Sequence, residues 1–448
     1  MLAVQAVIDN AADSATGSIA DAVSNMQTIV VATHNAGKVP EIIAALDLPD
    51  TRFLSLADLG LTDEAAEVAK SLAGNAWIKA GFVFSRTRQA TLADDSGLEV
   101  DALDGLPGVR SARYAGERAS DAENLEKLLQ AMQELPDEQR RARFVCEIAY
   151  VAADGSQLSA RGVCEGRIAR EPRGGGGFGY DPVFIPDNPG DGRTMAELSP
   201  DEKSAISHRG LALRQLRDKL AACRGAAPRV ALAAFDFDGT LLAVASPVRL
   251  VFRLLRLQMM PLSVGFQVFW WAIRYKLHLA VNQDQVRRYI YSAFAKTPAE
   301  VARRLMVKLY YDKLKARLRP KGMQEVEWQR GAGRKIILIS ASFEPILGVL
   351  AAELRADFFI STEMEVVDGR YTGQVAAVPP EGIYKLLHLQ HKADAVYGEG
   401  NWYLDYAFGD HFNDAYLLSL ALHPVVVSPD RGLAATAREL SWEIADWD

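Results

Sequence analysis

Residues 230–241 read VALAAFDFDGTL, an unbroken apolar run that leads into two acids, Asp236 and Asp238. A continuous apolar run of this kind is typical of a parallel strand that is buried on both faces. Ligands of open parallel sheets bind at the carboxyl ends of the strands, which is where the two acids stand. Two carboxylates at such a place can act as nucleophile and as acid/base over one cation. The stretch therefore predicts a parallel α/β unit with a catalytic edge.

Two later runs repeat this arrangement of an apolar strand with a polar end. Lys335–Ile339 leads into Ser340, whose hydroxyl can bind phosphate, and Tyr406–Phe408 leads into GDHFND, which contains Asp410 and Asp414. Carboxylate oxygens are hard ligands that suit Mg²⁺. A chance acidic turn explains any one of these stretches, but the three together indicate one site.

The spacing of these motifs resembles the haloacid dehalogenase superfamily of phosphatases from about Val230 to Asp448. The resemblance implies a Rossmann-like parallel sheet with an inserted helical cap, at about 247–330, that closes over the substrate. It also implies an aspartyl-phosphate intermediate on Asp236, with Asp238 as general acid/base. The implied phosphate ligands are Ser340 and Lys385, and the implied Mg²⁺ ligands are Asp236, Asp238, Asp410 and Asp414.

The substrate implied for this half is a phosphomonoester whose identity stays open. The motif layout resembles the phosphoserine-phosphatase-like branch, but recognition of an ammonium group calls for a carboxylate just past Thr240, and Leu241–Val251 contain none. We therefore expect a substrate other than phosphoserine. A cap rich in Trp, Phe, Leu and Arg suits an apolar or lipid phosphate ester, although core packing explains the same residues.

The stretch Leu257–Ile273 carries no charge and includes four aromatic residues. A membrane span needs about 20 apolar residues, and this run is shorter and interrupted by polar residues. We expect a buried helix pair and no membrane contact. A membrane-surface lipid phosphatase is the alternative.

The half from Met26 to about Leu220 alternates strand-like runs with helical patterns and predicts a mixed α/β domain. Its first motif lies between a strand-like run, Ile29–Ala32, and a helical pattern that begins at Val39. Small residues there expose backbone N–H groups at a helix start, an arrangement that suits phosphate, although an ordinary turn explains the motif taken alone. The motif consists of Thr33, His34, Asn35, Ala36, Gly37 and Lys38.

The second motif is a pair of adjacent acids, Asp94 and Asp95, followed by Ser96. We place the pair at the end of a strand-like run, Ala90–Leu92, where mutual repulsion calls for a cation such as Mg²⁺. Glu41 and Glu67 can supply further oxygens.

The third and fourth motifs suit a purine base. Arg173 precedes four glycines and Phe178–Pro182, and a flexible loop with an aromatic tip can cover a flat base. A strand-like run follows this loop, so its Gly-x-Gly-x-x-Gly pattern does not indicate a dinucleotide site. The fourth motif contains Lys203, His208 and Arg209, whose donors can pair with a 6-oxo purine edge but not with a 6-amino group.

In this order the four motifs resemble the inosine/xanthosine triphosphate pyrophosphatase family over nearly all of Met26–Leu220. The resemblance implies Mg²⁺-dependent hydrolysis of non-standard purine nucleoside triphosphates (ITP, dITP, XTP) to a monophosphate and pyrophosphate. It also implies a homodimer formed through this domain. The implied roles are phosphate and ribose binding by Thr33–Lys38, catalysis and metal binding by Asp95, metal binding by Glu67, substrate contact by Ser96, base binding by Phe178, Gly179, Tyr180 and Asp181, and completion of the pocket by Lys203, His208 and Arg209.

This chain departs from the family pattern in its acids. The family carries paired acids where this chain has Ala66 and Glu67, and a further acid near Gly74, so only Glu67 remains here. The alternative is therefore that one half is inactive and is retained as a nucleotide sensor.

The chain has 448 residues, a formal net charge of -7 and three cysteines. The charge argues against a protein that coats a nucleic-acid polymer, and three distant cysteines indicate no disulfide framework and fit the cytoplasm. We expect a bifunctional hydrolase with a disordered tail at 1–25, a pyrophosphatase domain at 26–221, a linker at 222–229 and a phosphatase domain at 230–448. The fusion suggests that the second half dephosphorylates the monophosphate that the first half releases.

Overall fold

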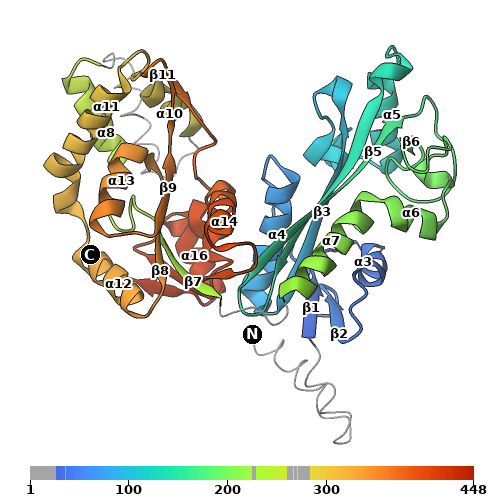
Figure 1. The fold of residues 1–448 in the computed structure, drawn as a ribbon, viewed down its shortest axis with the longest axis horizontal. Coiled ribbons are helices and arrows are strands. Elements are labelled where there is room, and N and C mark those ends of the chain that lie inside the picture. Colours follow the sequence, from blue (N-terminus) through green and yellow to red (C-terminus); the bar gives the residue numbers. More distant parts are fainter. Residues whose placement is uncertain are drawn as a thin grey trace, which may run out of the picture. The chain divides into compact units, whose positions relative to one another are not determined.

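The computed structural model describes residues 27–35, 37–223, 229–259, 266, 270 and 283–447. The described residues form two compact units, which belong to Met1–Ala227 and Pro228–Asp448 (Figure 1). The expected tail 1–25, the motif residue Ala36, most of the expected linker and most of Leu257–Ile273 lie outside the described residues.

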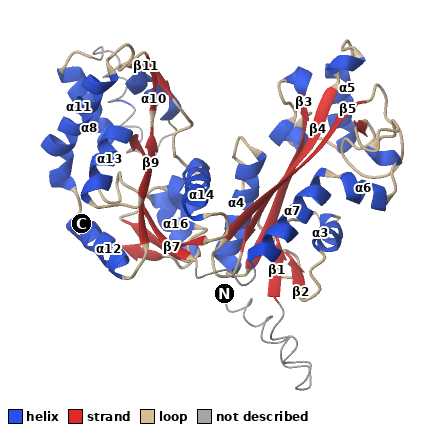
Figure 2. Cartoon of the chain, in the orientation of Figure 1, coloured by secondary structure: helices blue, strands red, loops and turns tan. Residues whose placement is uncertain are grey.

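One six-stranded sheet in the order β2-β1-β3-β4-β5-β6 forms the centre of the first unit. β1 pairs in parallel with β2 and β3, and β3 to β6 continue as antiparallel neighbours. The strands are β1 (Gln27–Val31), β2 (Thr51–Ser55), β3 (Ala90–Val100), β4 (Arg141–Val151), β5 (Gln157–Ile168) and β6 (Phe184–Pro186). This arrangement confirms the expected mixed α/β architecture (Figure 2).

Helices cover both faces of this sheet. α3 (Lys38–Leu46) and α7 (His208–Cys223) share one apolar core with β1, β3, β4 and β5, whereas α4 (Leu72–Thr87) packs against β3 and β4. α5 (Asp121–Ala131) and α6 (Pro200–Ile206) complete the unit, and both begin at a serine whose side chain accepts a hydrogen bond from the third helical N–H. Such caps satisfy N–H groups that the helix itself leaves without partners.

The expectation that Asp94 and Asp95 stand at the end of a strand is wrong. β3 continues through both acids to Val100, and it pairs with β4 without a break from Thr91↔Val151 to Val100↔Ala142. The long antiparallel partner supplies backbone hydrogen bonds along the whole strand, which a search for apolar runs does not detect. The acids therefore lie in the middle of the sheet.

The second unit contains a six-stranded sheet in the order β14-β13-β12-β7-β8-β9, in which every pair is parallel. The strands are β7 (Val230–Phe235), β8 (Lys335–Phe343), β9 (Phe358–Thr362), β12 (Trp402–Gly409), β13 (His423–Val427) and β14 (Glu443–Ala445). The helices among them are α12 (Pro320–Gly331), α13 (Glu344–Glu353), α14 (Ile383–Tyr397), α15 (Ala415–Leu418) and α16 (Arg431–Glu439). The three apolar runs of the sequence are thus the adjacent strands β12, β7 and β8, as a Rossmann-like parallel sheet requires.

A helical segment follows β7. Its described helices are α8 (Ser246–Arg256), α10 (Gln283–Ser292) and α11 (Ala299–Leu309), which ends in a π-helical turn, Tyr310–Leu314. A hairpin of β10 (Met364–Val367) and β11 (Arg370–Val375) packs on α10, although it lies far along the chain. α12, which begins inside the expected cap at 247–330, packs against β8 of the sheet. The hairpin was not predicted from the sequence.

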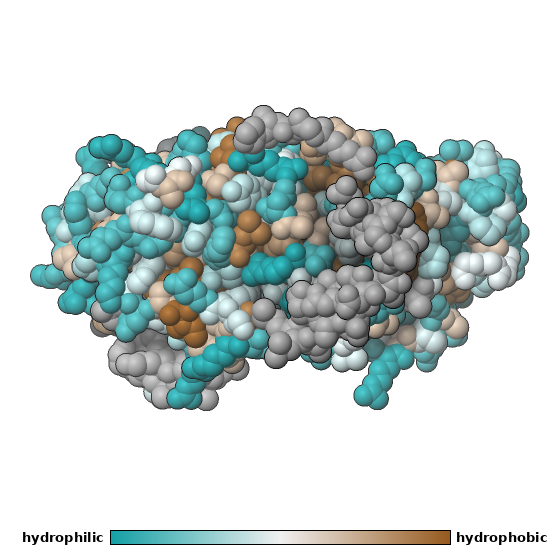
Figure 3. Space-filling model, turned by 90° about the horizontal axis from the view of Figure 1, so that it is seen from below, coloured by the Kyte–Doolittle hydropathy of each residue, from teal (hydrophilic) through white to brown (hydrophobic). Residues whose placement is uncertain are grey.

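Polar side chains dominate the face of the molecule drawn in Figure 3, where hydrophobic residues form small separate areas. Within the described part of the chain, no helix is both long and apolar enough to cross a membrane.

Candidate functional sites

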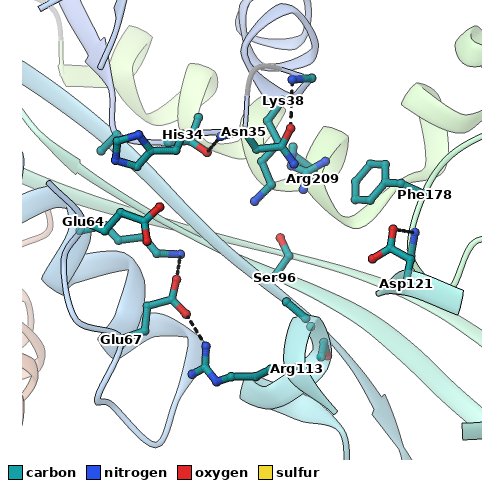
Figure 4. A pocket seen from close by; sticks show the side chains of 18 of the residues that line it. His34, Asn35, Lys38, Glu64, Glu67, Ser96, Arg113, Asp121, Phe178 and Arg209 are labelled. Atoms are coloured by element: carbon teal, nitrogen blue, oxygen red, sulfur yellow. Dashed lines mark hydrogen bonds and ion pairs between the residues drawn. The ribbon is translucent and has the colours of Figure 1, made fainter. Parts of the chain in front are cut away.

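A cavity of about 1140 Å³ lies in the first unit, at the carboxyl end of β1. The pairing of β1 with β3 ends at Val31 and Leu92. Among the described residues no other strand pairs with β3 on that side, so the edge of β3 beyond Leu92 is open to the cavity. Most of the predicted site residues line it: Thr33, His34, Asn35, Gly37, Lys38, Glu67, Ser96, Phe178, Gly179, Tyr180, Asp181, Lys203, His208 and Arg209. Figure 4 shows Lys38, Arg209 and Phe178 on one side of Ser96, with Glu67 and Arg113 on the other.

Strand alternation sends the two acids of β3 to opposite faces of the sheet. Asp94 points to the face of α3 and α7, where its Oδ2 accepts hydrogen bonds from Lys38 Nζ (3.0 Å) and Arg209 Nε (3.3 Å). Burial alone would raise the pKa of Asp94, but the nearby cations outweigh burial and hold this pKa well below its ordinary value. Asp94 is thus an ionised anchor for two cations that line the cavity. Glu41, a suggested oxygen donor, instead binds Arg209 Nη1 at 2.7 Å.

Asp95 points to the face of α4. Its Oδ1 lies 2.7 Å from Lys79 Nζ and its Oδ2 lies 3.3 Å from Asn75 Nδ2. Burial raises the pKa of Asp95, and Lys79 offsets this only in part. Asp95 does not itself line the cavity, whereas Lys79 does.

Lys79 also connects Asp95 to Glu67, because its Nζ lies 2.7 Å from Glu67 Oε1. Arg113 donates to the other oxygen of Glu67 at 3.1 Å. Lys79 was not among the site residues predicted from the sequence. The signal available was its position on α4 one turn after Asn75, which places both polar side chains on one face of a buried helix.

Glu67 and Asp95 fit a hard divalent cation in their chemistry, since both offer carboxylate oxygens within reach of one ammonium group. In residues 27–35 and 37–223, however, no third acid or histidine completes a ligand group with them. The candidate ligands in this unit are therefore these two carboxylates.

The opposite end of the cavity combines an aromatic ring with cations. Phe178 is half exposed, and Lys203 Nζ and the Arg209 guanidinium lie 5.1 and 5.8 Å from the centre of its ring. Asp181 Oδ2 accepts hydrogen bonds from Lys203 Nζ (2.7 Å) and from the backbone N–H of Phe178 (2.8 Å). Tyr180 donates to the carbonyl of Ser111 at 2.8 Å. These contacts fix the loop that presents Phe178.

His208 begins α7, directly after a break at Ser207 that separates this helix from α6. Its ring is buried and stacks on Phe144 at 4.8 Å between ring centres. Burial holds the pKa of His208 well below its ordinary value, so the imidazole is neutral at pH 7. A neutral imidazole can both donate and accept a hydrogen bond in the cavity.

A second candidate site lies at the carboxyl ends of β7 and β12. The carboxylates of Asp236, Asp410 and Asp414 approach within 4.8 Å of one another. Lys385 from α14 donates to Asp236 Oδ1 at 2.6 Å and to Asp414 Oδ1 at 2.5 Å. Burial is the main cause that raises the pKa of Asp236 and of Asp410, and their neighbouring carboxylates add to it. One lysine does not neutralise three acids, of which Asp236 and Asp414 are buried and Asp410 is partly buried, so the group fits a divalent cation.

Asp238 does not join this group in the structure, although we expected it among the metal ligands. Its oxygens accept hydrogen bonds from the N–H (2.5 Å) and hydroxyl (2.8 Å) of Ser246, the first residue of α8. Burial raises the pKa of Asp238 to about 7. A carboxyl group with this pKa can give and take a proton near neutral pH.

Hydroxyl groups and a glycine surround the acids. Ser340 accepts from the N–H of Ser342 at 3.1 Å, and Ser342 contacts Ser246 at 2.8 Å between hydroxyl oxygens. Gly239 has φ +91° and lies so near Asp410 that a Cβ would stand 2.0 Å from its Oδ2. Only glycine permits this approach. Ser246 was not predicted from the sequence as a site residue. The available signal was its place directly before a proline at the start of a helix.

These two folds and sites define a chain of two hydrolase units in tandem. Comparison with known families agrees: residues 29–219 match the Ham1 family and residues 233–419 match the haloacid dehalogenase-like hydrolases. The chain belongs to the Ham1 family and carries a haloacid dehalogenase-like hydrolase domain after it, which confirms both resemblances seen in the sequence.

Three individual proteins illustrate the similarity. A dITP/XTP pyrophosphatase of Shigella flexneri is 49% identical over 197 residues, which are 44% of this chain and 98% of the relative. The solved structure of a HAM1 protein from Coxiella burnetii is 45% identical, covers 44% of this chain and 100% of its own, and has a TM-score of 0.41. A phosphoserine phosphatase solved as a phospho-aspartyl intermediate analogue is 16% identical, covers 50% of this chain and 95% of its own, and has a TM-score of 0.36.

Proposed function

We propose that the chain is a bifunctional hydrolase. Its first unit hydrolyses non-standard purine nucleoside triphosphates (ITP, dITP, XTP) to a monophosphate and pyrophosphate with Mg²⁺. Its second unit hydrolyses a phosphomonoester through an aspartyl phosphate. The observation that carries the first activity is the meeting, in one cavity, of the cationic turn at Lys38, the acid Glu67 and the ring of Phe178. Asp95 is joined to this cavity through Lys79, which lines it and binds both Asp95 and Glu67. The activity in the name of the Shigella flexneri relative supports it.

In the first unit the residues divide the substrate between them. Lys38 and Arg209, both anchored by Asp94, attract the triphosphate, and Phe178 stacks on the base. Lys203 and His208 donate hydrogen bonds to the 6-oxo group of the purine. The 6-amino group of adenine is itself a donor and cannot accept these bonds. Asp95, whose raised pKa makes it a proton acceptor, takes the proton of the water that attacks the α-phosphorus. The Pα–O bond to the pyrophosphate group then breaks.

Glu67 and Asp95 would hold Mg²⁺ in this unit, and Asp236, Asp410 and Asp414 would hold it in the second. When bound, Mg²⁺ screens phosphate charge and lowers the pKa of water. In the second unit a carboxylate oxygen of Asp236 forms a bond to phosphorus while the ester bond breaks. Asp238 gives its proton to the departing oxygen and later takes one from the water that releases phosphate. Ser340 and Lys385 bind the phosphoryl group; the contact of Lys385 with Asp236 supports this role.

The test uses the full chain and its Asp95→Asn and Asp236→Asn variants. Pyrophosphate release is measured with ITP, dITP, XTP and, for comparison, ATP, and phosphate release is measured with p-nitrophenyl phosphate. We expect Asp95→Asn to lower pyrophosphate release by about 10²–10⁴-fold. Asp236→Asn should instead abolish phosphate release, so each variant is the control for the other unit.

Three results would count against the proposal. ATP turnover equal to ITP turnover would contradict the purine selectivity. A wild-type first unit that binds ITP without releasing pyrophosphate would support the nucleotide sensor in its place. For the second unit, mass spectrometry after acid quench should find a phosphoryl group on the peptide that contains Asp236, and its absence during turnover would exclude the aspartyl phosphate.

A further inference from the structure

A second cavity in the first unit, of about 350 Å³, shares no lining residue with the large cavity. It lies where β5 ends at Ile168, beside β6. Arginines outnumber acids in its lining, which contains Arg140, Arg167, Arg170, Arg173, Asp137 and Glu171. We call this cavity the arginine pocket.

Arg140 forms the floor of the arginine pocket and is 3% exposed. Its guanidinium donates to three backbone carbonyls, those of Ile168 (2.8 Å), Met132 (2.6 Å) and Ala169 (2.9 Å). Each acceptor is uncharged, so these bonds fix the guanidinium without neutralising it. A buried cation in this state favours an anion beside it.

Arg167 stands at the rim, on β5. The residue directly opposite on β4 is Arg141, and like charges in such a cross-strand pair repel. Arg141 is neutralised by Asp187, which accepts two hydrogen bonds from it at 2.9 Å. In the described part of the first unit, no acid lies within ion-pair distance of Arg167. Its donors are therefore available to a ligand.

The remaining two arginines add charge without closing the arginine pocket. Arg170 pairs with Asp137 at 2.7 Å, but both side chains are more than half exposed, so the pair is weak and open to exchange. Arg173 donates one hydrogen bond to the carbonyl of Gly192 at 2.8 Å.

We propose that the arginine pocket binds a compact multivalent oxyanion, either phosphate or pyrophosphate. The planar guanidinium fork matches pairs of phosphate oxygens, and four arginines line this one cavity. The volume is at the lower end of small-molecule cavities, which suits an anion of this size rather than a whole nucleotide.

The place of the arginine pocket in the fold gives such binding a consequence. Arg173 directly precedes the glycine loop that presents Phe178 to the large cavity, and its N–H donates to the carbonyl of Pro182 at 2.8 Å. An anion held at Arg173 therefore sits at the base of that loop. If pyrophosphate is the ligand, the product of the proposed reaction also binds outside the large cavity, at the base of the loop that carries Phe178. This consequence, unlike the binding itself, rests on the proposed function.

The test is equilibrium dialysis of the full chain with labelled phosphate or pyrophosphate, in EDTA and at constant ionic strength. Arg167→Gln should weaken binding at one site about tenfold or more, because one charge-assisted contact is lost, and Arg167→Lys should restore part of it. Arg161→Gln is the matched control: Arg161 is exposed on the same face of β5, pairs with Glu147 at 3.0 Å and does not line the arginine pocket. Equal binding by wild type and Arg167→Gln, or an equal loss in Arg161→Gln, overturns the proposal.

Two further comparisons separate the sources of binding. The loss in Arg167→Gln should persist when Lys38→Ala has removed an anion contact in the large cavity, and its disappearance there would assign the binding to that cavity and refute the proposal. Preference for pyrophosphate over phosphate identifies the ligand. Failure of the chain to hydrolyse ITP would refute the proposed function and leave this binding result intact.

Discussion

The adjacent acids Asp94 and Asp95 should have very different effects on stability when each is changed to Asn. Asp94 accepts hydrogen bonds from Lys38 and Arg209 in a buried position, and removal of one partner from a buried ion pair costs about 3–5 kcal/mol. Arg209 keeps Glu41 as a partner. We therefore expect the lower end, about 3 kcal/mol, for Asp94→Asn.

Asp95→Asn should change the free energy of unfolding by no more than about 1 kcal/mol. Burial raises the pKa of Asp95, which means that its charge is disfavoured in the folded protein despite Lys79. Lys79 keeps Glu67 after the change, so no buried cation is left without a partner. Both variants carry the same chemical change on neighbouring residues, and each is the control for the other.

Thiol labelling in urea isolates the unit of interest, because Cys146, Cys164 and Cys223 all lie in the first unit, the first two buried. With a urea dependence of about 1–3 kcal/mol/M, a loss of 3 kcal/mol lowers the labelling midpoint by about 1–3 M. EDTA keeps metal binding out of the comparison. Equal midpoints for the two variants would refute the assignment of the acids to different environments.

The pH dependence has a defined sign for Asp94. Its pKa is lowered in the folded state relative to the unfolded value of about 3.9, so its contribution to stability is present above that pH and is lost as the pH falls. The difference in midpoint between wild type and Asp94→Asn should therefore shrink on acidification below about pH 4. A difference that grows instead would contradict the direction of the shift.

Three further predictions follow from the sites. Gly177→Ala should raise KM for ITP about tenfold or more, because the added Cβ would stand 2.2 Å from Asp181 Oδ2 and the backbone there has φ +76°. Gly175→Ala is the control and should leave KM unchanged, because no atom lies within 4 Å of its Cβ. Equal effects of the two variants would refute a role of the close approach between Gly177 and Asp181. Asp238→Asn should lower p-nitrophenyl phosphate turnover by about 10²–10⁴-fold and spare pyrophosphate release; full phosphatase activity would remove Asp238 as the acid. Wild type incubated with ITP should release inosine if the units act in sequence, whereas accumulation of inosine monophosphate would show that they do not.

The sequence was sufficient for the parts of this protein that depend on local patterns. Apolar runs with polar ends located β7, β8 and β12, and motif spacing located both families. Asp236 and Asp410 could be placed together in advance because the carboxyl ends of neighbouring parallel strands meet at one edge.

The partners of the acids required the tertiary structure. Asp94 and Asp95 look alike in the sequence, but alternation along β3 turns them to opposite faces, and the packing of α3, α7 and α4 decides what each one meets. Lys79 is sixteen residues away from Asp95 and on another element, so no local pattern joins them.

The same holds for Ser246, which binds Asp238 only because α8 begins beside the end of β7. Periodicity and motifs thus determined which strands, helices and reactive residues this protein has. The tertiary fold alone decided which charges face one another, because pairing of side chains across a sheet depends on which helices cover each face and not on distance along the chain.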